Sequence, residues 1–376
     1  MSGEYIHQRL DWPTLRWDDA RLSSVLADVR YRQGRLLGRM EGLGFQLRKE
    51  ASLTTLTTEV VKTSMIEGEQ LDADAVRSSI ARRLGLDVGG TSRASRDVEG
   101  VVEMMLDATQ NYTQRLTVQR LLDWHAALFP AGRSGMRRIT VGAWRTAEIG
   151  PMQVVSGPIG REQVHFEAPS ANRLEHEMSA FLNWFNAAIG IDPVIKAGVA
   201  HFWFVTIHPF EDGNGRIARA IADLVLARAE GTAERFYSAS AQIEAERKQY
   251  YLQLERSQRG DVDITSWLAW FLNCLGRALA RAELELGNVL RKAKIWERIN
   301  QAPVNERQRK IINRLLDGFE GKLTTSKYAR IVKSSEDTAL RDIKNLVDRG
   351  VLVRNEGGGR SVSYRLVEPD SDDCGF

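Results

Sequence analysis

The segment from His208 to Arg219 combines residue types that can bind a phosphate chain and move a proton. It reads HPFEDGNGRIAR. Two glycines in a turn before an expected helix let backbone N–H groups approach an anion closely, and the helix N-terminus adds positive partial charge. Arg216 and Arg219 are three residues apart, so they take neighbouring positions on that helix and add two full charges. The segment therefore predicts a binding site for a polyphosphate.

Two further side chains of this segment suit the transfer of a phosphorus group. A single carboxylate such as Asp212, together with phosphate oxygens, is the usual way to hold Mg²⁺. The imidazole of His208 titrates near neutral pH and can take a proton from an attacking hydroxyl. Taken singly, each residue has a simpler interpretation: a core or capping histidine for His208, a helix cap for Asp212, and a pair with Asp223 for Arg219.

The segment resembles the Fic signature, His-x-Phe-x-Asp/Glu-Gly-Asn-Gly-Arg-x-x-Arg, at every specified position. The resemblance implies a protein adenylyltransferase that moves AMP from ATP onto a Ser, Thr or Tyr hydroxyl of a target protein or of itself. It also implies that His208 is the general base, that Phe210 anchors the loop, and that Asp212 holds Mg²⁺. Val205 departs from many relatives, which have Glu at that position. The resemblance assigns the α- and β-phosphates to Gly213, Asn214, Gly215 and Arg216, and the γ-phosphate to Arg219.

An upstream segment, Thr63 to Gly68, resembles the inhibitory motif of the same family, Ser/Thr-x-x-x-Glu-Gly/Asn. Thr63 and Glu67 are four residues apart and share one helix face, and Gly68 can end that helix. The resemblance implies that Glu67 pairs with Arg219 and competes with the γ-phosphate for its guanidinium, so that ATP binds in a pose unfit for transfer. The alternative is a solvated Glu67 beside a helix stop.

Mainly helical elements are expected to position these residues. Apolar residues at spacings of three and four predict helices over residues 1–85, 97–105, 118–128, 175–188, 193–205, 214–229, 241–257 and 264–286. Between Gly135 and Pro169 the pattern becomes β-prone, with short pieces at 138–141, 153–156 and 163–166. The last two pieces, around a mobile tip at 157–160, are similar in position to the family's flap, which aligns the target chain as an added strand.

The C-terminal part has the element order of a winged helix. A charged helix at 286–300 leads to a boundary at Gln301-Ala302-Pro303. Three helices then precede two strands joined by Gly357, Gly358 and Gly359. The elements are expected at 307–316, 325–332, 336–348, 351–355 and 361–366. The fold class is therefore mainly α, a Fic helical core with a small β-hairpin flap, followed by an α+β winged-helix domain.

Residues 305–366 resemble winged-helix domains of transcription regulators, with Ser335 to Ile343 as the candidate recognition helix. Residues 291–366 contain eighteen Lys and Arg against nine Asp and Glu, so they carry +9 and the rest of the chain carries −6. DNA binding is one interpretation, and protein docking or a homodimer is the other. Candidate wing cations are Arg354, Arg360 and Arg365, whereas Glu336, Asp337 and Asp342 weigh against DNA.

Composition supports a globular chain with several domains. The sequence has 376 residues, 43% of them hydrophobic, and a net charge of +3, which is too small to imply membrane or nucleic-acid binding by the whole molecule. Two cysteines without pair spacing and the lack of an apolar leader or spanning segment predict a cytoplasmic protein. The expected domains are an N-terminal helical domain with the inhibitory helix, the Fic core, the winged helix and an acidic tail, at 1–95, 96–288, 289–367 and 368–376.

Three functions remain open at this point. The first is the transfer of AMP, restrained by Glu67. The second uses the same site for a bifunctional or mainly de-AMPylating enzyme, in which Glu67 positions a water that removes AMP. The third is an ATP-responsive DNA-binding regulator that acts through the winged helix and uses the core only to sense ATP.

Overall fold

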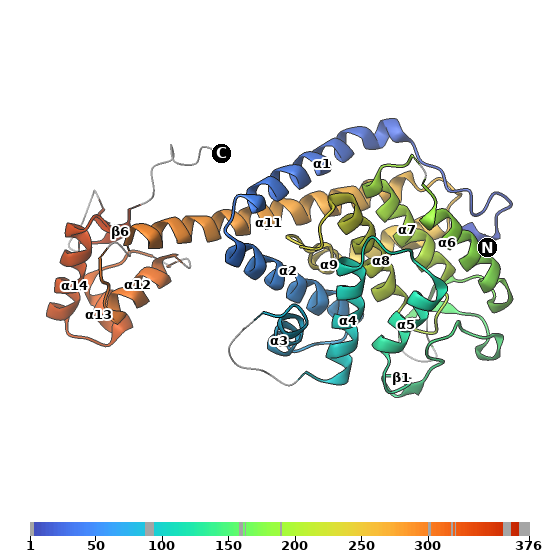
Figure 1. Ribbon diagram of the computed structural model, residues 1–376, viewed down its shortest axis with the longest axis horizontal. Coiled ribbons are helices and arrows are strands. Elements are labelled where there is room, and N and C mark those ends of the chain that lie inside the picture. Colours follow the sequence, from blue (N-terminus) through green and yellow to red (C-terminus); the bar gives the residue numbers. More distant parts are fainter. Residues whose placement is uncertain are drawn as a thin grey trace. The chain divides into compact units, whose positions relative to one another are not determined.

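The computed structural model describes residues 4–86, 94–157, 161, 163–188, 190–299, 302–316, 319, 321–355 and 362–367. The chain divides into two compact units, Met1–Ala282 and Glu283–Phe376, and the division falls within the helix α11 (Thr265–Ile299). Helices dominate the first unit, and its strands form only short antiparallel hairpins (Figure 1). The expected mainly α fold is therefore confirmed.

The first unit begins with a 3-10 helix at Ile6–Gln8 and contains helices joined by short connections. Its α-helices before the hairpins are α1 (Asp19–Glu41), α2 (Phe45–Ile66), α3 (Ala73–Arg83), α4 (Arg96–Gln110) and α5 (Val118–Leu128). After the hairpins come α6 (Leu174–Asn186), α7 (Pro193–Ile207), α8 (Asn214–Glu230), α9 (Ala239–Ala245) and α10 (Arg247–Gln258). Two more 3-10 turns lie at Ala147–Ile149 and Ala171–Arg173.

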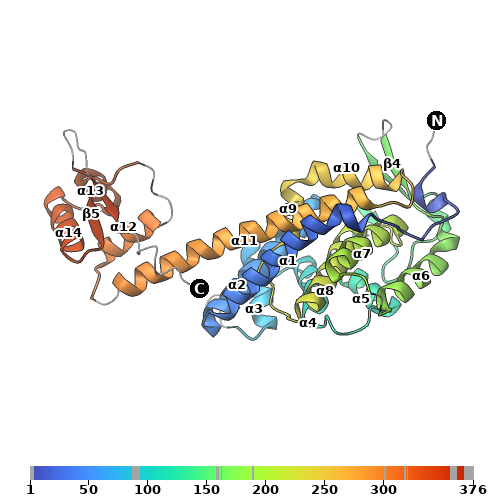
Figure 2. The ribbon, with the colours of Figure 1, turned by 90° about the horizontal axis from the view of Figure 1, so that it is seen from above.

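The helices α7 and α8 form the centre of this unit (Figures 1 and 2). Every residue of α7 except Pro193 and Lys196 is buried, as expected of a helix that is apolar on all sides. Asp192 caps its start, because its carboxylate accepts a hydrogen bond from the Val194 N–H at 2.8 Å. On α8 pack α2, α4 and α5, while α6 packs on α7. The loop between α7 and α8 is thus held by two buried helices.

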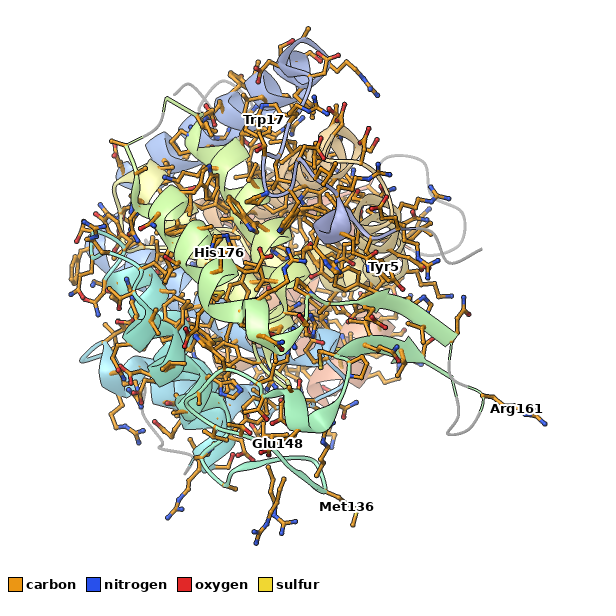
Figure 3. All side chains as sticks on the ribbon, turned by 90° about the vertical axis from the view of Figure 1, so that its right-hand side faces the viewer. Tyr5, Trp17, Met136, Glu148, Arg161 and His176 are labelled. Atoms are coloured by element: carbon orange, nitrogen blue, oxygen red, sulfur yellow. The ribbon has the colours of Figure 1, made fainter. Side chains whose placement is uncertain are left out.

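The flap hairpin pairs β3 (Gln153–Ser156) with β4 (Gln163–Glu167) in antiparallel register, with an irregularity between Val154 and Val155. Figure 3 shows it extending from the body, with Arg161 pointing outward. The expected mobile tip at 157–160 falls mostly outside the described residues. A second, very short hairpin joins β1 (Arg133–Ser134) to β2 (Arg137–Arg138).

Three expectations about elements were wrong. The strand expected at 138–141 ends at Arg138, because the Thr140 N–H donates to the carboxylate of Glu211 at 3.1 Å instead of to a neighbouring strand. The helix expected at 241–257 is divided at Glu246, whose φ of −110° and ψ of 24° are not helical. The two helices expected around residue 286 form the single helix α11.

The second unit has the winged-helix order. Its helices are α12 (Glu306–Leu316), α13 (Thr325–Val332) and α14 (Glu336–Asp348), followed by the antiparallel strands β5 (Leu352–Arg354) and β6 (Tyr364–Leu366). Lys333, with φ of +54°, makes the turn between α13 and α14. A core of buried residues includes Ile311, Tyr328 and Ile343. The glycine turn at 357–359 and Arg360 lie outside the described residues.

Among the described residues, none of the helices is both long and apolar enough to cross a membrane. Nor does that part of the chain contain a group of three or more His, Cys, Asp or Glu side chains arranged to hold a metal ion.

Candidate active site

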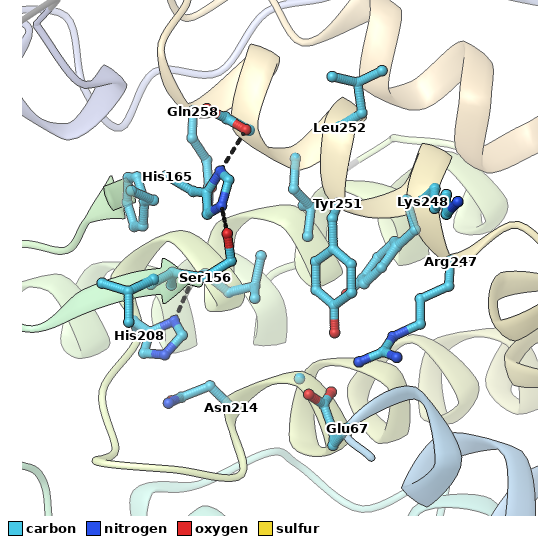
Figure 4. A pocket seen from close by; sticks show the side chains of 18 of the residues that line it. Glu67, Ser156, His165, His208, Asn214, Arg247, Lys248, Tyr251, Leu252 and Gln258 are labelled. Atoms are coloured by element: carbon cyan, nitrogen blue, oxygen red, sulfur yellow. Dashed lines mark hydrogen bonds and ion pairs between the residues drawn. The ribbon is translucent and has the colours of Figure 1, made fainter. Parts of the chain in front are cut away.

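The signature segment and the upstream glutamate meet in one cavity of about 1170 Å³ (Figure 4). His208, Asp212 and Gly215 lie on one side, at the loop between α7 and α8. Glu67 enters from the end of α2. The flap hairpin and α10 form the remaining walls. The cavity has the size of a small-molecule site.

His208 ends α7 in the left-handed conformation, with φ of 51° and ψ of 59°. Its Nδ1 lies 3.2 Å from the carbonyl oxygen of Val205. A carbonyl only accepts, so Nδ1 carries the proton and Nε2 of the neutral ring keeps its lone pair. Desolvation lowers the pKa of His208 to about 4, an effect that the Val205 carbonyl opposes and the Arg145 cation reinforces. The ring is therefore neutral at pH 7, as a base must be.

Arg145 holds the turn that presents His208. Its Nε donates to the carbonyl of His208 at 2.8 Å, and its Nη2 reaches the carbonyls of Pro169 and Ile207. Its backbone N–H donates to Pro209 at 2.9 Å. The side chain is 3% exposed, and this burial lowers the pKa of its guanidinium to about 10. Sequence reasoning missed Arg145, because it lies in a loop without periodic pattern.

The loop itself is closed by Phe210 and Asn214. Phe210 is fully buried, and its ring stacks on that of His125 with centroids 4.0 Å apart. The Asn214 amide accepts from the Phe210 N–H at 3.0 Å and donates to its carbonyl at 2.9 Å. Gly213 has φ of +82°, and a Cβ there would meet the Phe129 ring at 2.9 Å. The Asn214 side chain thus shapes the loop, which leaves backbone N–H groups for an anion.

Asp212 lies beside this loop and lines the cavity. One carboxylate oxygen accepts from the Gly213 N–H at 2.5 Å, and the other accepts from the Ser134 hydroxyl. The N-cap position of α8 is Gly213, so Asp212 is not its cap. A carboxylate with spare lone pairs next to an anion loop fits Mg²⁺, which takes one or two protein carboxylates and completes its shell with phosphate oxygens and water.

Arg219 is 2% exposed and is held from α2. Its Nε donates to Thr63 Oγ1 at 2.7 Å, and its Nη2 donates to the Thr63 carbonyl at 2.9 Å and to Glu67 Oε1 at 2.7 Å. The pairing expected from the resemblance is therefore present. The alternative partner, Asp223, instead pairs with Arg235 at 3.3 Å.

The Glu67 carboxylate also lies against the start of α8. A Cβ on Gly215 would overlap with Oε1 of Glu67, so only a glycine lets the carboxylate approach this closely. The carboxylate thus lies at the positive end of a helix and accepts from Nη2 of Arg219, where an anion would bind.

Arg216 has a carboxylate of its own. It is 2% exposed, lies over the Phe129 ring, and donates from Nη1 to Glu69 Oε2 at 2.7 Å. Burial raises the pKa of Glu69, and the Arg216 charge opposes that rise. Within the described part of the chain, the buried Arg216 Nε and Arg219 Nη1 have no hydrogen-bond partner. Unpaired buried donors are costly, so the site has unused capacity for an anion.

Sequence comparison assigns three segments. Residues 115–226 match the Fic/DOC family, residues 5–86 match a domain of unknown function, DUF4172, and residues 307–365 match a DeoR-like helix-turn-helix domain.

Residues 115–226 form a Fic/DOC family domain.

Curated relatives of this Fic protein are called protein adenylyltransferases. It is 30% identical to Protein adenylyltransferase fic-1 of Caenorhabditis elegans over 129 residues, which cover 34% of this chain and 23% of that protein. It is 28% identical to Protein adenylyltransferase Fic of Culex quinquefasciatus over 222 residues, which cover 57% of this chain and 39% of that protein. The matches thus span well under half the length of these relatives.

Two solved structures share the fold of this Fic protein. A Fic family protein from Desulfovibrio desulfuricans G20 has a TM-score of 0.51 and 19% identity, with 91% of this chain and 96% of that chain covered. A Fic domain containing signaling protein from Bacteroides thetaiotaomicron has a TM-score of 0.51 and 20% identity, with 68% and 95% covered. At such identities the likeness shows the fold alone.

The segment that resembles the inhibitory motif and the signature lie in different matched segments of the chain. Thr63, Glu67 and Glu69 lie within 5–86, whereas His208 and Arg219 lie within 115–226. The domain boundaries expected at 95, 288 and 367 stay predictions. Sequence reasoning missed Glu69, although its place two residues after Glu67 could have signalled a second carboxylate near the arginines.

Proposed function

We propose that this Fic protein transfers AMP from ATP to a protein hydroxyl. The observation that carries the proposal is one cavity in which the free lone pair of His208 lies beside an anion-binding loop. The names of the curated relatives, protein adenylyltransferases, agree with it.

In the reaction, ATP binds with its phosphates at the N-terminus of α8, close to Gly213, Gly215 and Arg216. The hydroxyl oxygen attacks the α-phosphorus and the bond to the pyrophosphate oxygen breaks. Nε2 of His208 takes the hydroxyl proton, because Nδ1 already donates to Val205. The backbone N–H groups at the N-terminus of α8 and the guanidinium of Arg216 stabilise the charge that develops on the oxygens bound to the phosphorus.

Asp212 would hold Mg²⁺, which supplies charge neutralisation to the phosphates when it is bound.

Glu67 restrains this reaction. Its carboxylate occupies Nη2 of Arg219, the arginine that the γ-phosphate needs for the productive pose. Thr63 keeps the guanidinium in place through two further hydrogen bonds. ATP can therefore enter the cavity while its α-phosphorus stays misaligned with the attacking hydroxyl.

Position-specific labelling of ATP tests the proposal. Glu67→Gly protein is incubated with Mg²⁺ and ATP labelled at either the α- or the γ-phosphate, and protein-bound label is measured after precipitation. AMP transfer retains the α label and releases the γ label. Retention of the γ label would identify phosphoryl transfer, and retention of neither label in the presence of candidate target proteins would count against any transfer.

A second candidate activity of the same cavity is the removal of AMP from a modified protein. The Glu67 carboxylate lines the cavity together with His208 (Figure 4), where it could hold a water for attack on a protein-bound AMP. Incubation of an AMP-modified protein without ATP separates the two: a loss of the AMP mass with wild-type protein but not with Glu67→Gln supports removal of AMP.

DNA binding is a candidate function of the second unit, favoured by the DeoR-like match. Asp342, which counted against DNA in the sequence, is buried and accepts from Arg307 at 2.8 Å and from the Tyr328 hydroxyl at 3.2 Å. The exposed residues of α14 include Arg341 and Lys344. Binding of labelled duplex DNA over a salt series tests this function, since phosphate contacts give a steep salt dependence. Absence of binding leaves protein docking or dimer formation for this unit.

A further inference from the structure

Two rows of side chains face each other where α2 packs on α8. The row on α2 has residues four positions apart, Glu59, Thr63 and Glu67. The row on α8 has the same spacing, Gly215, Arg219 and Asp223. At one end Glu67 lies against Gly215, and in the middle Thr63 accepts from Arg219. At the other end Glu59 is hydrogen-bonded to Asp223. This last pair is therefore on the face of α2 that also presents Glu67.

The pair consists of two buried carboxyl groups. Glu59 is 4% exposed and Asp223 is 3% exposed. Among the described residues, Oε1 of Glu59 and Oδ2 of Asp223 have no N–H or O–H donor from any other group. Two ionised carboxylates cannot hydrogen-bond to each other, because each only accepts. A hydrogen bond between them therefore requires that one of the two carries a proton.

The contacts of the two groups assign this proton to Asp223. The other oxygen of Glu59, Oε2, accepts from the Ser240 N–H at 3.1 Å and from the Ser238 hydroxyl at 2.5 Å, and both donors favour an ionised Glu59. Burial, and after it the charge of Glu59, raise the pKa of Asp223 well above its usual range. Oδ2 of Asp223 thus donates to Oε1 of Glu59.

The surrounding charges leave no second cation for the pair. Within the described part of the chain, only the Arg235 guanidinium contacts it, with Nη2 3.3 Å from Oδ1 of Asp223. Nη1 of Arg235 already donates to Glu230 at 2.6 Å. The Tyr237 hydroxyl and the Cys274 thiol add no charge, because burial raises the pKa of each. Loss of the shared proton would place three buried carboxylates around one guanidinium.

We propose that this shared proton fixes α2 on α8 and so holds Glu67 at Arg219. When the proton is lost, two ionised carboxylates face each other in a buried contact and repel, and α2 loosens from α8. Glu67 then leaves Arg219, so inhibition weakens as the pH rises above neutral. The effect on AMP transfer rests on the proposed function, whereas the proton and the loosening of α2 do not.

Infrared spectroscopy of the full-length protein tests the proton without ATP. A protonated carboxyl group has a C=O stretching band separate from the bands of carboxylates. Wild-type protein at pH 7 should show such a band, and Asp223→Asn should lack it. Asp74→Asn is the matched control, because Asp74 is an exposed aspartate on α3. Identical spectra of wild type and Asp223→Asn in this region would overturn the inference.

Amide hydrogen exchange tests the loosening of α2, also without ATP. Protection factors, which correct for the effect of pH on the intrinsic exchange rate, should fall along α2 in wild type between pH 7 and pH 9. They should not fall in Asp223→Asn, whose amide donates to Glu59 as the protonated carboxyl does and still accepts from Arg235. Glu59→Gln is a second variant, because its amide can donate to an ionised Asp223. Equal protection of α2 in wild type at both pH values would contradict the loosening.

AMP incorporation tests the link to inhibition. The ratio of the Glu67→Gly rate to the wild-type rate measures inhibition, and effects of pH on the chemistry cancel in it. This ratio should fall several-fold between pH 7 and pH 9, and it should stay unchanged when both proteins also carry Asp223→Asn. Equal ratios at the two pH values without Asp223→Asn would overturn the inference, and so would an equal fall with it.

Failure of the inference differs from failure of the proposed function. AMP transfer with a ratio that does not depend on pH would overturn the proton-dependent inhibition alone. No AMP transfer by any variant would overturn the proposed function, and the infrared and exchange results would then decide whether the proton holds α2 on α8.

Discussion

The Glu67 carboxylate lies 2.7 Å from Nη2 of Arg219, although 152 positions separate the two residues in the chain. Arg219 is buried, and its contacts with Thr63 leave Nη1 without a partner in the described part of the chain. In the proposed function, this internal carboxylate and the γ-phosphate of ATP compete for the same guanidinium. The regulation proposed for this protein depends on that competition.

Removal of the Glu67 carboxylate should raise AMP transfer. The Glu67→Gly variant should incorporate labelled AMP at least several-fold faster than wild type, because the γ-phosphate no longer has to displace a carboxylate worth about 1.5–3 kcal/mol as a charged hydrogen bond. Glu41→Gly is the matched control, since Glu41 is an exposed glutamate at the end of another helix. Equal initial rates of AMP incorporation for wild type and Glu67→Gly would contradict inhibition by Glu67.

Removal of the Glu69 charge should strengthen nucleotide binding. Glu69→Gln frees Arg216 for phosphate, and the side chain of Glu69 is 45% exposed, so the gain is modest. An exposed pair is worth about 1 kcal/mol or less, which corresponds to at most about a fivefold lower Kd. Calorimetry with Mg²⁺ and ATP in a His208→Ala background, which prevents turnover, measures the change. A weaker affinity would show that Glu69 supports the site instead of occupying it.

Replacement of Arg145 by lysine should slow transfer without weakening ATP binding. An ammonium cannot reproduce the fork that reaches the carbonyls of Ile207, His208 and Pro169. The left-handed turn at His208 should then relax, and displacement of the base can lower kcat by about a hundredfold. Exposed Arg138 offers the control Arg138→Lys. A kcat that stays at the wild-type value while KM rises would place Arg145 in substrate binding instead.

Unfolding should become easier as the pH falls below about 6.5. Burial lowers the pKa of His125 to about 4 and that of His201 to about 3, whereas both have pKa values near 6.5 when unfolded. Between these limits the unfolded chain binds more protons, so the unfolding free energy decreases with falling pH. Each histidine contributes at most about 1.4 kcal/mol per pH unit.

Denaturant unfolding at pH 7, 6 and 5 measures this slope. His201→Gln should reduce the slope, and the exposed His176, labelled in Figure 3, gives His176→Gln as a control that should not. Equal unfolding free energies at pH 7 and 5 would contradict the neutral state of the buried rings.

Local patterns in the sequence predicted much of this molecule. The residues that signal a helix, its apolar stripe and its caps, are close together in the sequence. The helix at 118–128 and the start of α8 at Asn214 therefore agree with expectation. The signature and the inhibitory motif are likewise short and contiguous. The prediction of a strand at 138–141 was wrong because the Thr140 N–H donates to Glu211, which is 71 positions away in the sequence.

Long-range contacts could not be predicted in the same way. Arg145 reaches His208 across 63 positions, Glu69 reaches Arg216 across 147, and Glu255 reaches His165 across 90. None of these residues belongs to a pattern with its partner, because each contact depends on how separate helices and loops pack. A single sequence carries no signal for such pairs beyond the presence of opposite charges.

The proposed reaction depends on His208 as its general base, and a comparison of two variants tests this role most directly. The initial rate of labelled AMP incorporation into protein hydroxyls is measured at pH 7 for Glu67→Gly and for Glu67→Gly with His208→Ala, after both are shown to melt at similar temperatures and to bind ATP. A rate lower by about a hundredfold or more without His208 is the predicted result. Similar rates in the two variants would contradict the account.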